Sequence, residues 1–279
     1  MVKCYSVEAA FNSTSLQGGI QMKRVFGLFL AVMMISMVAI SCAESNDLAY
    51  IQGKGKLVVG ITDFAPMDYK DQNGEWIGFD ADLATAFAAK LGVAVEFAEI
   101  DWDNKILELN GKSIDCVWNG MTLTEEVLAA MDCSKPYANN AQVVVIPADK
   151  AKDYADVASM SALSFAVEAG SAGASEVSAL GYAMTEVSSQ AAALMEVSAG
   201  TSDAAVIDAL MAAAMVGEGT GYDNLVYTFA LNAEEYGVGF RKGSDLVAAL
   251  NEFLAESYKD GSMMSIAETY GVQAAIIAQ

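Results

Sequence analysis

The chain of 279 residues has no histidine, and its 15 lysines and arginines face 36 aspartates and glutamates. The absence of histidine excludes imidazole-based catalysis and histidine-ligated metal sites. The net charge of −21 argues against nucleic-acid binding, because contact with phosphates needs clustered lysines and arginines. We therefore expect no metal, no cofactor and no nucleic-acid partner.

Cysteine is also scarce, and its four positions, Cys4, Cys42, Cys116 and Cys133, show no CxxC spacing. The absence of that spacing argues against a zinc or redox motif. Cys116 and Cys133 lie in neighbouring expected segments, so they are compatible with a disulfide in an oxidising compartment and equally with two buried free thiols.

The longest apolar run lies near the N-terminus and has the pattern of a secretory signal. Met22, Lys23 and Arg24 open a basic start, residues 25–40 are apolar, and Ser41 follows. The run is short for a membrane span, although an uncleaved N-terminal anchor is the alternative. We expect Met22 to be the true start and residues 1–41 to be a signal peptide, with 22–41 as its working part.

Residues 39–42, Ala-Ile-Ser-Cys, resemble the lipobox of bacterial lipoproteins, in which the cysteine is lipidated and becomes the new N-terminus. The resemblance implies an exported chain, held by lipid on Cys42 at the extracellular or periplasmic face of the cell membrane. Residues 42–56, which are polar and contain glycine, would then form a tether.

The rest of the chain alternates between strand and helix patterns, which predicts an α/β fold with mainly parallel sheets. In the first part, expected strands at 57–61, 93–97 and 114–118 alternate with expected helices at 79–91 and 104–109. A second set begins with an expected strand at 142–146. It continues with strands at 163–167, near 184–187 and at 204–207. A turn at 170–173 opens a helix that runs to about 180, and further helices are expected at 189–197 and 208–216. A strand at 236–240 and helices at 245–258 and 262–270 follow.

The stretch from Ile114 to Tyr137 is the best candidate for a site. An apolar strand ends at Asn119 and Gly120, and Thr122 and Thr124 precede a short helical run at 125–130. Thr124 is a suitable N-cap, and the acids lie in the first turn, where the helix dipole stabilises negative charge. Open α/β sheets bind ligands where a strand ends in a polar turn that opens a helix, although an ordinary connection looks the same in sequence.

Residues 78–91, GFDADLATAFAAKL, resemble the signature of family 3 extracellular solute-binding proteins, the amino-acid receptors of ABC importers. Further matching segments follow the family order within residues 55–270: 59–60, 64–66, 101–103, 111–115, 120–124, 134–137, 203–208 and 237–242.

The resemblance implies a two-lobed periplasmic-binding-protein fold of type II, with the ligand in the cleft. Two crossovers near 139–146 and 231–236 would join the lobes. Lobe 1 would comprise 48–140 and 236–279, and lobe 2 would comprise 141–235. The lobes would close over the ligand in a hinge motion.

The resemblance also implies a set of ligand-binding residues. Phe64 and Trp102 match the aromatic walls, although both could simply be core residues. Asp208 matches the acid that binds the ligand's α-ammonium, although it could instead be a plain helix N-cap. The remaining matches are Asn119, Gly120 and Thr122 in lobe 1 and the turn with Ser171 and Ala172 in lobe 2.

Two positions depart from the family pattern. Val127 stands where the family has an arginine that binds the α-carboxylate, and Ala172 stands where a threonine is common. Because Asp208 is kept, we expect the cleft to depend more on the ligand's amine than on its carboxylate.

These observations predict a monomeric, lipid-anchored receptor that delivers a polar amino acid or related small amine to an ABC permease. An enzyme on the same fold, similar to a cyclohexadienyl dehydratase, is the alternative. The absence of histidine and of an evident acid–base carboxylate pair disfavours it. A ligand sensor is a further alternative.

Overall fold

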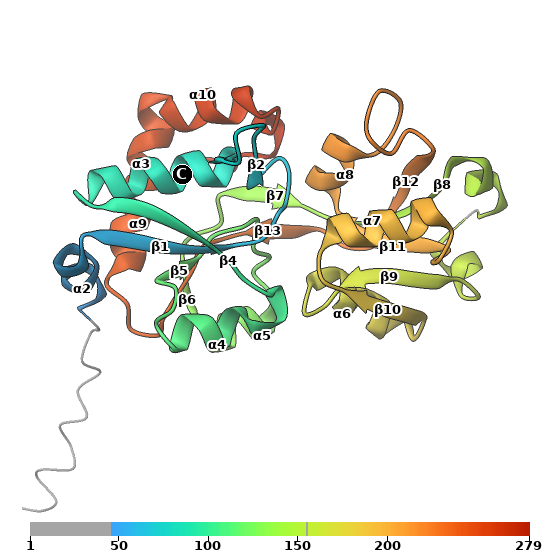
Figure 1. Ribbon diagram of the computed structural model, residues 1–279, viewed down its shortest axis with the longest axis horizontal. Coiled ribbons are helices and arrows are strands. Elements are labelled where there is room, and N and C mark those ends of the chain that lie inside the picture. Colours follow the sequence, from blue (N-terminus) through green and yellow to red (C-terminus); the bar gives the residue numbers. More distant parts are fainter. Residues whose placement is uncertain (1–45, 155) are drawn as a thin grey trace, which may run out of the picture. The chain divides into compact units, whose positions relative to one another are not determined.

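The computed structural model describes residues 46–154 and 156–279, and these form two α/β lobes, each built on a five-stranded sheet (Figure 1). The signal peptide and Cys42 lie outside the described residues. Within the described part of the chain, no helix has the length and apolar character needed to cross a membrane.

Lobe 1 is the part of the chain built on the first sheet. Its strands, in spatial order, are β4 (Ala94–Glu99), β1 (Lys56–Ile61), β5 (Cys116–Val117), β14 (Gly239–Phe240) and β6 (Asp132–Cys133). Its helices are α2 (Asp47–Lys54), α3 (Phe79–Lys90), α4 (Lys105–Asn110), α5 (Glu125–Ala130), α9 (Leu246–Asp260) and α10 (Ser262–Thr269). A short hairpin, β2 (Tyr69–Lys70) and β3 (Trp76–Ile77), and the 3₁₀ turns η1 (Trp102–Asn104) and η4 (Gln273–Ala275) complete it.

Strand β1 is buried on both faces, which explains its unbroken apolar sequence. Leu57, Val59 and Ile61 belong to the core that contains the apolar side chains of α3, α9 and α10. Val58 belongs instead to the core under α4 and α5. The alternation follows from the two-residue period of a strand.

Lobe 2 has the second sheet, in the order β10 (Ala183–Val187), β9 (Ser164–Glu168), β11 (Ala204–Asp208), β8 (Gln142–Pro147) and β12 (Leu225–Ala230). Its helices are α6 (Ala172–Leu180), α7 (Gln190–Ala199) and α8 (Ala209–Met215), with the 3₁₀ turns η2 (Ala148–Asp153) and η3 (Val157–Met160). Helix α6 shares a core with Val144 and Val206, and α7 shares one with Val143 and Val145.

Each sheet contains three parallel strands, as the alternating pattern predicts, and two antiparallel ones. The parallel sets are β4-β1-β5 and β10-β9-β11. The other strands, β14 and β6 in the first sheet and β8 and β12 in the second, pair antiparallel. The prediction of mainly parallel sheets therefore holds only for the strands joined by helical crossovers.

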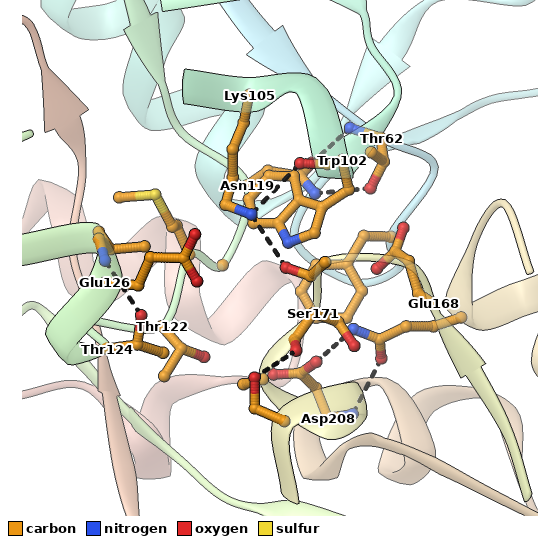
Figure 2. Close-up of a pocket in the computed structure, with 18 of the residues that line it drawn as sticks. Thr62, Trp102, Lys105, Asn119, Thr122, Thr124, Glu126, Glu168, Ser171 and Asp208 are labelled. Carbon is orange, nitrogen blue, oxygen red and sulfur yellow. Dashed lines mark hydrogen bonds between the residues drawn. The ribbon is translucent and has the colours of Figure 1, made fainter. Parts of the chain in front are cut away.

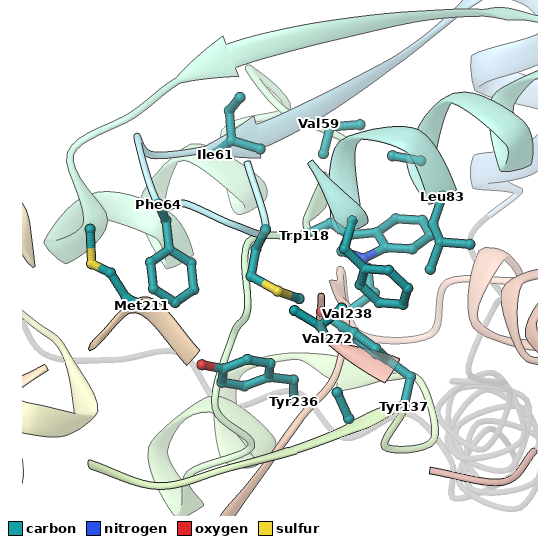
Figure 3. Packing of buried hydrophobic residues seen from close by; sticks show 14 of the residues in the cluster. Val59, Ile61, Phe64, Leu83, Trp118, Tyr137, Met211, Tyr236, Val238 and Val272 are labelled. Atoms are coloured by element: carbon teal, nitrogen blue, oxygen red, sulfur yellow. The ribbon is translucent and has the colours of Figure 1, made fainter. Parts of the chain in front are cut away.

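Two antiparallel strands, β7 (Ala138–Asn140) and β13 (Glu234–Tyr236), pair where the chain passes between the sheets. They overlap the ends of the segments 139–146 and 231–236, which the family resemblance gives as crossovers. Tyr236, at the end of β13, packs in one continuous core with Phe64 of lobe 1 and Met211 of lobe 2 (Figure 3).

Two expectations need correction. Residues 47–54 of the expected tether form helix α2, because Asn46 caps it and Ile51 is fully buried in the core of lobe 1. Strand β12 was not expected at all. It pairs antiparallel with β8 at the edge of its sheet, and its side chains are mostly half-buried or exposed.

Cys116 and Cys133 are free thiols. Strand β14 lies between their strands, with Phe240 opposite Cys116 and Gly239 opposite Cys133. Two strand spacings amount to about 9–10 Å, which is beyond the reach of a disulfide. Of the two alternatives left open by the sequence, the structure therefore has the free thiols.

Candidate ligand-binding site

A cavity lies where loops of lobe 1 face strand ends and helix starts of lobe 2 (Figure 2). Every residue that the sequence predicts to bind ligand contributes to its wall: Phe64, Trp102, Asn119, Gly120, Thr122, Ser171, Ala172 and Asp208. The structure thus brings together positions up to 144 residues apart in the chain. Their contact with a ligand stays a prediction.

The two aromatic residues, Phe64 and Trp102, are at once core residues and cavity walls. Phe64 is 3% exposed and meets the Tyr236 ring edge-on, with centroids 6.5 Å apart. Trp102 is 8% exposed and packs in the core under α4 and α5. The core and ligand-binding interpretations are therefore compatible, because one face of each ring can pack while the other borders the cavity.

The turn at Asn119 and Gly120 is held by hydrogen bonds within the protein. The Asn119 side chain accepts from the backbone N–H of Thr62 at 3.0 Å and donates to the Thr62 hydroxyl at 2.7 Å. The Gly120 N–H donates to Asp80 Oδ2 at 2.6 Å. These groups therefore shape the cavity wall, and the Gly120 N–H already has an acceptor.

Thr122 and Thr124 have different roles. Thr124 caps α5, because its hydroxyl accepts from the Val127 N–H at 3.2 Å, and the helix has the bounds expected from sequence. The Thr122 hydroxyl donates to Glu234 Oε1 at 2.9 Å. Since Glu234 belongs to β13, this bond ties the lobe 1 wall to a crossover.

Ser171 and Ala172 form the start of helix α6 in lobe 2. Ser171 is the N-cap, and its hydroxyl accepts from the Ala174 N–H at 3.0 Å. Ala172 is the first helical residue. The helix start thus turns toward the cavity, as expected, but its serine hydroxyl is used for capping.

Asp208 ends β11 and occupies the N-cap position of α8, but its side chain makes no capping hydrogen bond. Its carboxylate accepts from the Tyr236 hydroxyl at 2.6 Å and from the amides of Asn140 and Gln190. Burial, and then the charge of Glu234, raise the pKa of Asp208 to about 7.

Two buried charged residues in the cavity wall, Lys105 and Glu168, were missed by the sequence interpretation. Glu168 ends β9, is 4% exposed, and its Oε1 has no hydrogen-bond partner. Burial, and then the charge of Asp208, raise the pKa of Glu168 to about 8. Glu168, like Asp208, is an acid that follows an expected apolar strand, so its position is visible in the sequence, but the family resemblance singled out only Asp208.

Lys105 opens helix α4 directly after the turn that carries Trp102. It is 7% exposed, and its ammonium lies 4.8 Å from the centroid of the Trp102 ring. Burial lowers the pKa of Lys105, against the charges of Glu126 and Glu168. A lone lysine in a short polar helix resembles an ordinary solvated side chain, so the sequence carries no signal for it.

No group of three or more cysteine, aspartate or glutamate side chains within 46–154 and 156–279 is arranged to hold a metal ion. The cavity instead offers aromatic surface, hydroxyls and charges of both signs. This chemistry suits a small polar organic molecule.

Two α/β lobes with paired crossovers and a polar cavity between strand ends define a solute-binding protein. The family model for bacterial extracellular solute-binding proteins, family 3, matches residues 57–273, and the chain belongs to this family. It is therefore classed with binding proteins of ABC importers and not with enzymes.

Three relatives illustrate the range of proteins to which this chain is similar. The L-cystine-binding protein TcyJ of Escherichia coli K12 is 25% identical over 251 residues, covering 88% of this chain and 94% of TcyJ. The arginine-binding extracellular protein ArtP of Bacillus subtilis is 28% identical over 243 residues, covering 85% and 93%. The crystal structure of AncCDT-1, an ancestral amino acid-binding protein and precursor of cyclohexadienyl dehydratase, has a TM-score of 0.73 at 31% identity, covering 80% and 98%.

Proposed function

We propose that this chain is a lipid-anchored receptor at the outer face of the cell membrane that delivers a polar amino acid or a related small amine to an ABC permease. The observation that carries the proposal is the pairing of aromatic walls with buried carboxylates in one cavity. Trp102 and Phe64 supply the aromatic surface, and Asp208 and Glu168 supply acids that are 4% exposed.

Buried carboxylates favour a cationic ligand for an energetic reason. Each acid loses hydration, as the raised pKa values of Asp208 and Glu168 reflect. A ligand ammonium would form a charge-assisted hydrogen bond with such a carboxylate in a site that excludes water. An amine over the Trp102 ring would gain about 0.5–2 kcal/mol more from the aromatic face.

The relatives support an amino acid as the ligand class, since TcyJ is named for L-cystine and ArtP for arginine. They differ in ligand, so they do not select one. Among the described residues of the cavity wall, the acids Asp63, Glu126, Glu168 and Asp208 outnumber the single base Lys105, which favours amino acids with a basic side chain over acidic ones.

The test is a thermal-shift screen of the mature chain with the common amino acids, polyamines and amine-containing metabolites, followed by calorimetry on the compounds that raise the melting temperature. We expect at least one basic or polar amino acid to bind, with a dissociation constant in the micromolar range or below. Asp208→Asn should weaken that binding strongly. A screen in which no amino acid or amine binds would refute the receptor proposal.

The lipid anchor is tested separately on Cys42. Expression in a bacterium with lipoprotein processing should give a membrane-associated chain whose N-terminus carries the mass of a lipidated cysteine. Cys42→Ser should be released or remain unprocessed, while Cys4→Ser should behave as wild type. Unchanged membrane fractionation of Cys42→Ser would refute the anchor and leave the receptor proposal intact.

A further inference from the structure

Lys105 reaches across the cavity wall to the opposite lobe. It starts α4 in lobe 1, and its Nζ donates to the carbonyl oxygen of Gly170 in lobe 2 at 2.9 Å. A second bond goes to the carbonyl oxygen of Trp102 at 3.3 Å. An ammonium has three donors, so these two bonds leave one N–H of Lys105 without a hydrogen-bond acceptor among the described residues.

The charge of Lys105 has no close counter-ion. No carboxylate of the described residues lies within 4.0 Å of its Nζ. By contrast, seven such contacts join other lysines and arginines of the described residues to acids. These cations are Lys54, Lys56, Lys70, Lys90, Arg241 and Lys242. A buried cation held by carbonyl oxygens and an aromatic ring, without a counter-ion, costs free energy that an anion at the same place would recover. Because Lys105 lines the cavity, that anion can come from a ligand.

The position that carries the arginine in the family pattern offers no charge here. Val127 lies in the same cavity wall, 4% exposed, and packs with Trp102 in the core under α4 and α5. Lys105 is the only lysine or arginine among the described residues that line the cavity. The cation of the cleft is thus on α4 and not on α5.

The cavity also presents an acid with one unpaired oxygen. Glu168 Oε1 is buried and accepts no hydrogen bond, and Glu168 lies close enough to Lys105 for their charges to interact without forming an ion pair. A cation and an acid that both face one cavity, each short of a partner, complement a ligand that carries both charges.

We propose that Lys105 is the carboxylate anchor of this cleft and that the ligand is a zwitterionic amino acid. Its carboxylate would pair with Lys105, and its ammonium would lie on the side of Asp208 and Glu168. This inference rests on the proposed function and deepens it. It replaces the sequence-based expectation that the cleft depends mainly on the ligand's amine. That expectation rested on the loss of carboxylate-binding groups at Val127 and Ala172 and gave Lys105 no role.

The experiment compares each amino acid that binds with its α-amide, in calorimetry on the mature chain. Wild type should bind the acid at least tenfold more tightly than the amide. Lys105→Met should weaken binding of the acid at least tenfold and leave binding of the amide nearly unchanged. The variant would then no longer prefer the acid over the amide. Lys105→Arg should keep it. The double variant Lys105→Met/Val127→Arg should restore it by returning the cation from α5.

The matched control is Lys259→Met, which removes the same charge at an exposed position in the last turn of α9. It should preserve both affinities, and melting temperatures report whether each variant folds. Equal weakening of acid and amide by Lys105→Met would make Lys105 a purely structural link to Gly170 and overturn the proposal. If the wild type binds amides or carboxylate-free amines as tightly as it binds acids, the proposal is overturned even if Lys105→Met fails to fold. The receptor function would still stand.

Discussion

Asp80 Oδ2 accepts a hydrogen bond from the backbone N–H of Gly120 at 2.6 Å, and the same oxygen accepts from the Tyr137 hydroxyl at 2.7 Å. A carboxylate in the first turn of α3 thereby holds the turn that follows β5, 40 residues away. Gly120 has φ +55°, and a Cβ built on it would come within 2.4 Å of the Phe64 ring. The turn thus needs glycine for both its backbone and its contact with the aromatic wall.

Gly120→Ala should destabilise the protein and displace Phe64 from the cavity wall. The positive φ alone costs an alanine about 1–2 kcal/mol, and crowding against a ring adds about 1–3 kcal/mol. Gly92→Ala is the matched control, since Gly92 has φ +75° but nothing within 4 Å of its built Cβ. Denaturant unfolding should show a larger loss for Gly120→Ala, and equal losses would mean that the Phe64 contact contributes nothing.

Asp68→Asn should stabilise the protein at alkaline pH. Asp68 is fully buried, neither of its carboxylate oxygens has a hydrogen-bond partner, and burial and the charge of Asp80 raise its pKa well above the usual value. Burial also raises the pKa of Asp80 to about 7. The folded chain therefore binds these protons more tightly than the unfolded chain, and the resulting stability is full below about pH 4 and is lost as pH rises. The part that Asp80 contributes is lost through about pH 7.

Melting temperatures at about pH 5 and about pH 8.5 check this sign. Wild type should lose stability at the higher pH, and Asp68→Asn should lose less and exceed wild type there. The exposed control Asp223→Asn should follow wild type. An Asp68→Asn variant that is less stable than wild type at alkaline pH would show that Asp68 is stabilising as an ionised group.

Ligand binding should release protons, and Glu168→Gln should reduce the release. The pKa of Glu168 is raised to about 8 and that of Asp208 to about 7, so part of both acids is protonated near pH 7. A ligand ammonium favours the ionised forms, so binding lowers both pKa values and affinity should rise from about pH 6 to about pH 9.

Calorimetry in buffers of different ionisation enthalpy measures the released protons directly. Glu168→Gln should release fewer protons and show a flatter pH dependence, while the exposed control Glu218→Gln should match wild type. Proton uptake by the wild type would contradict the assignment of an ammonium to this side of the cavity.

Trp102→Leu should separate ligand contact from packing. Trp102→Ala would remove a residue that is 8% exposed and packed in the core, at a cost of about 3–5 kcal/mol, so it weakens both binding and folding. Leucine retains much of the buried apolar volume but no aromatic face. We expect Trp102→Leu to weaken binding at least tenfold, about 1.4 kcal/mol, with a smaller loss of melting temperature than Trp102→Ala.

Phe253→Leu is the comparison, because Phe253 is similarly buried at 7% but does not line the cavity. It should lower the melting temperature and leave the dissociation constant unchanged. If Trp102→Leu behaves in the same way, Trp102 is a core residue that binds no ligand.

Local features of the chain were sufficient to predict most of its elements. Helix α5 has the bounds expected from sequence, because the Thr124 cap, the acids of the first turn and the apolar residues that follow all act within a few positions. The alternating patterns likewise predicted the strands that pair in parallel. The failures include α2, whose burial depends on distant parts of lobe 1, and β12, whose pattern is blurred at the edge of its sheet. The two-residue strands β2, β3 and β6 were not expected either.

The sequence by itself determined the α/β fold class through its alternating strand and helix patterns, and it placed Asn119 at a strand end, where such folds bind ligands. The family resemblance added the wall positions Ser171 and Asp208. Only the tertiary structure decided which of their polar groups are already used and which charges lack a partner. Lys105 and Glu168 lie 63 residues apart on different lobes. Burial and the supply of counter-charges depend on what surrounds a side chain in space, and no local pattern records that.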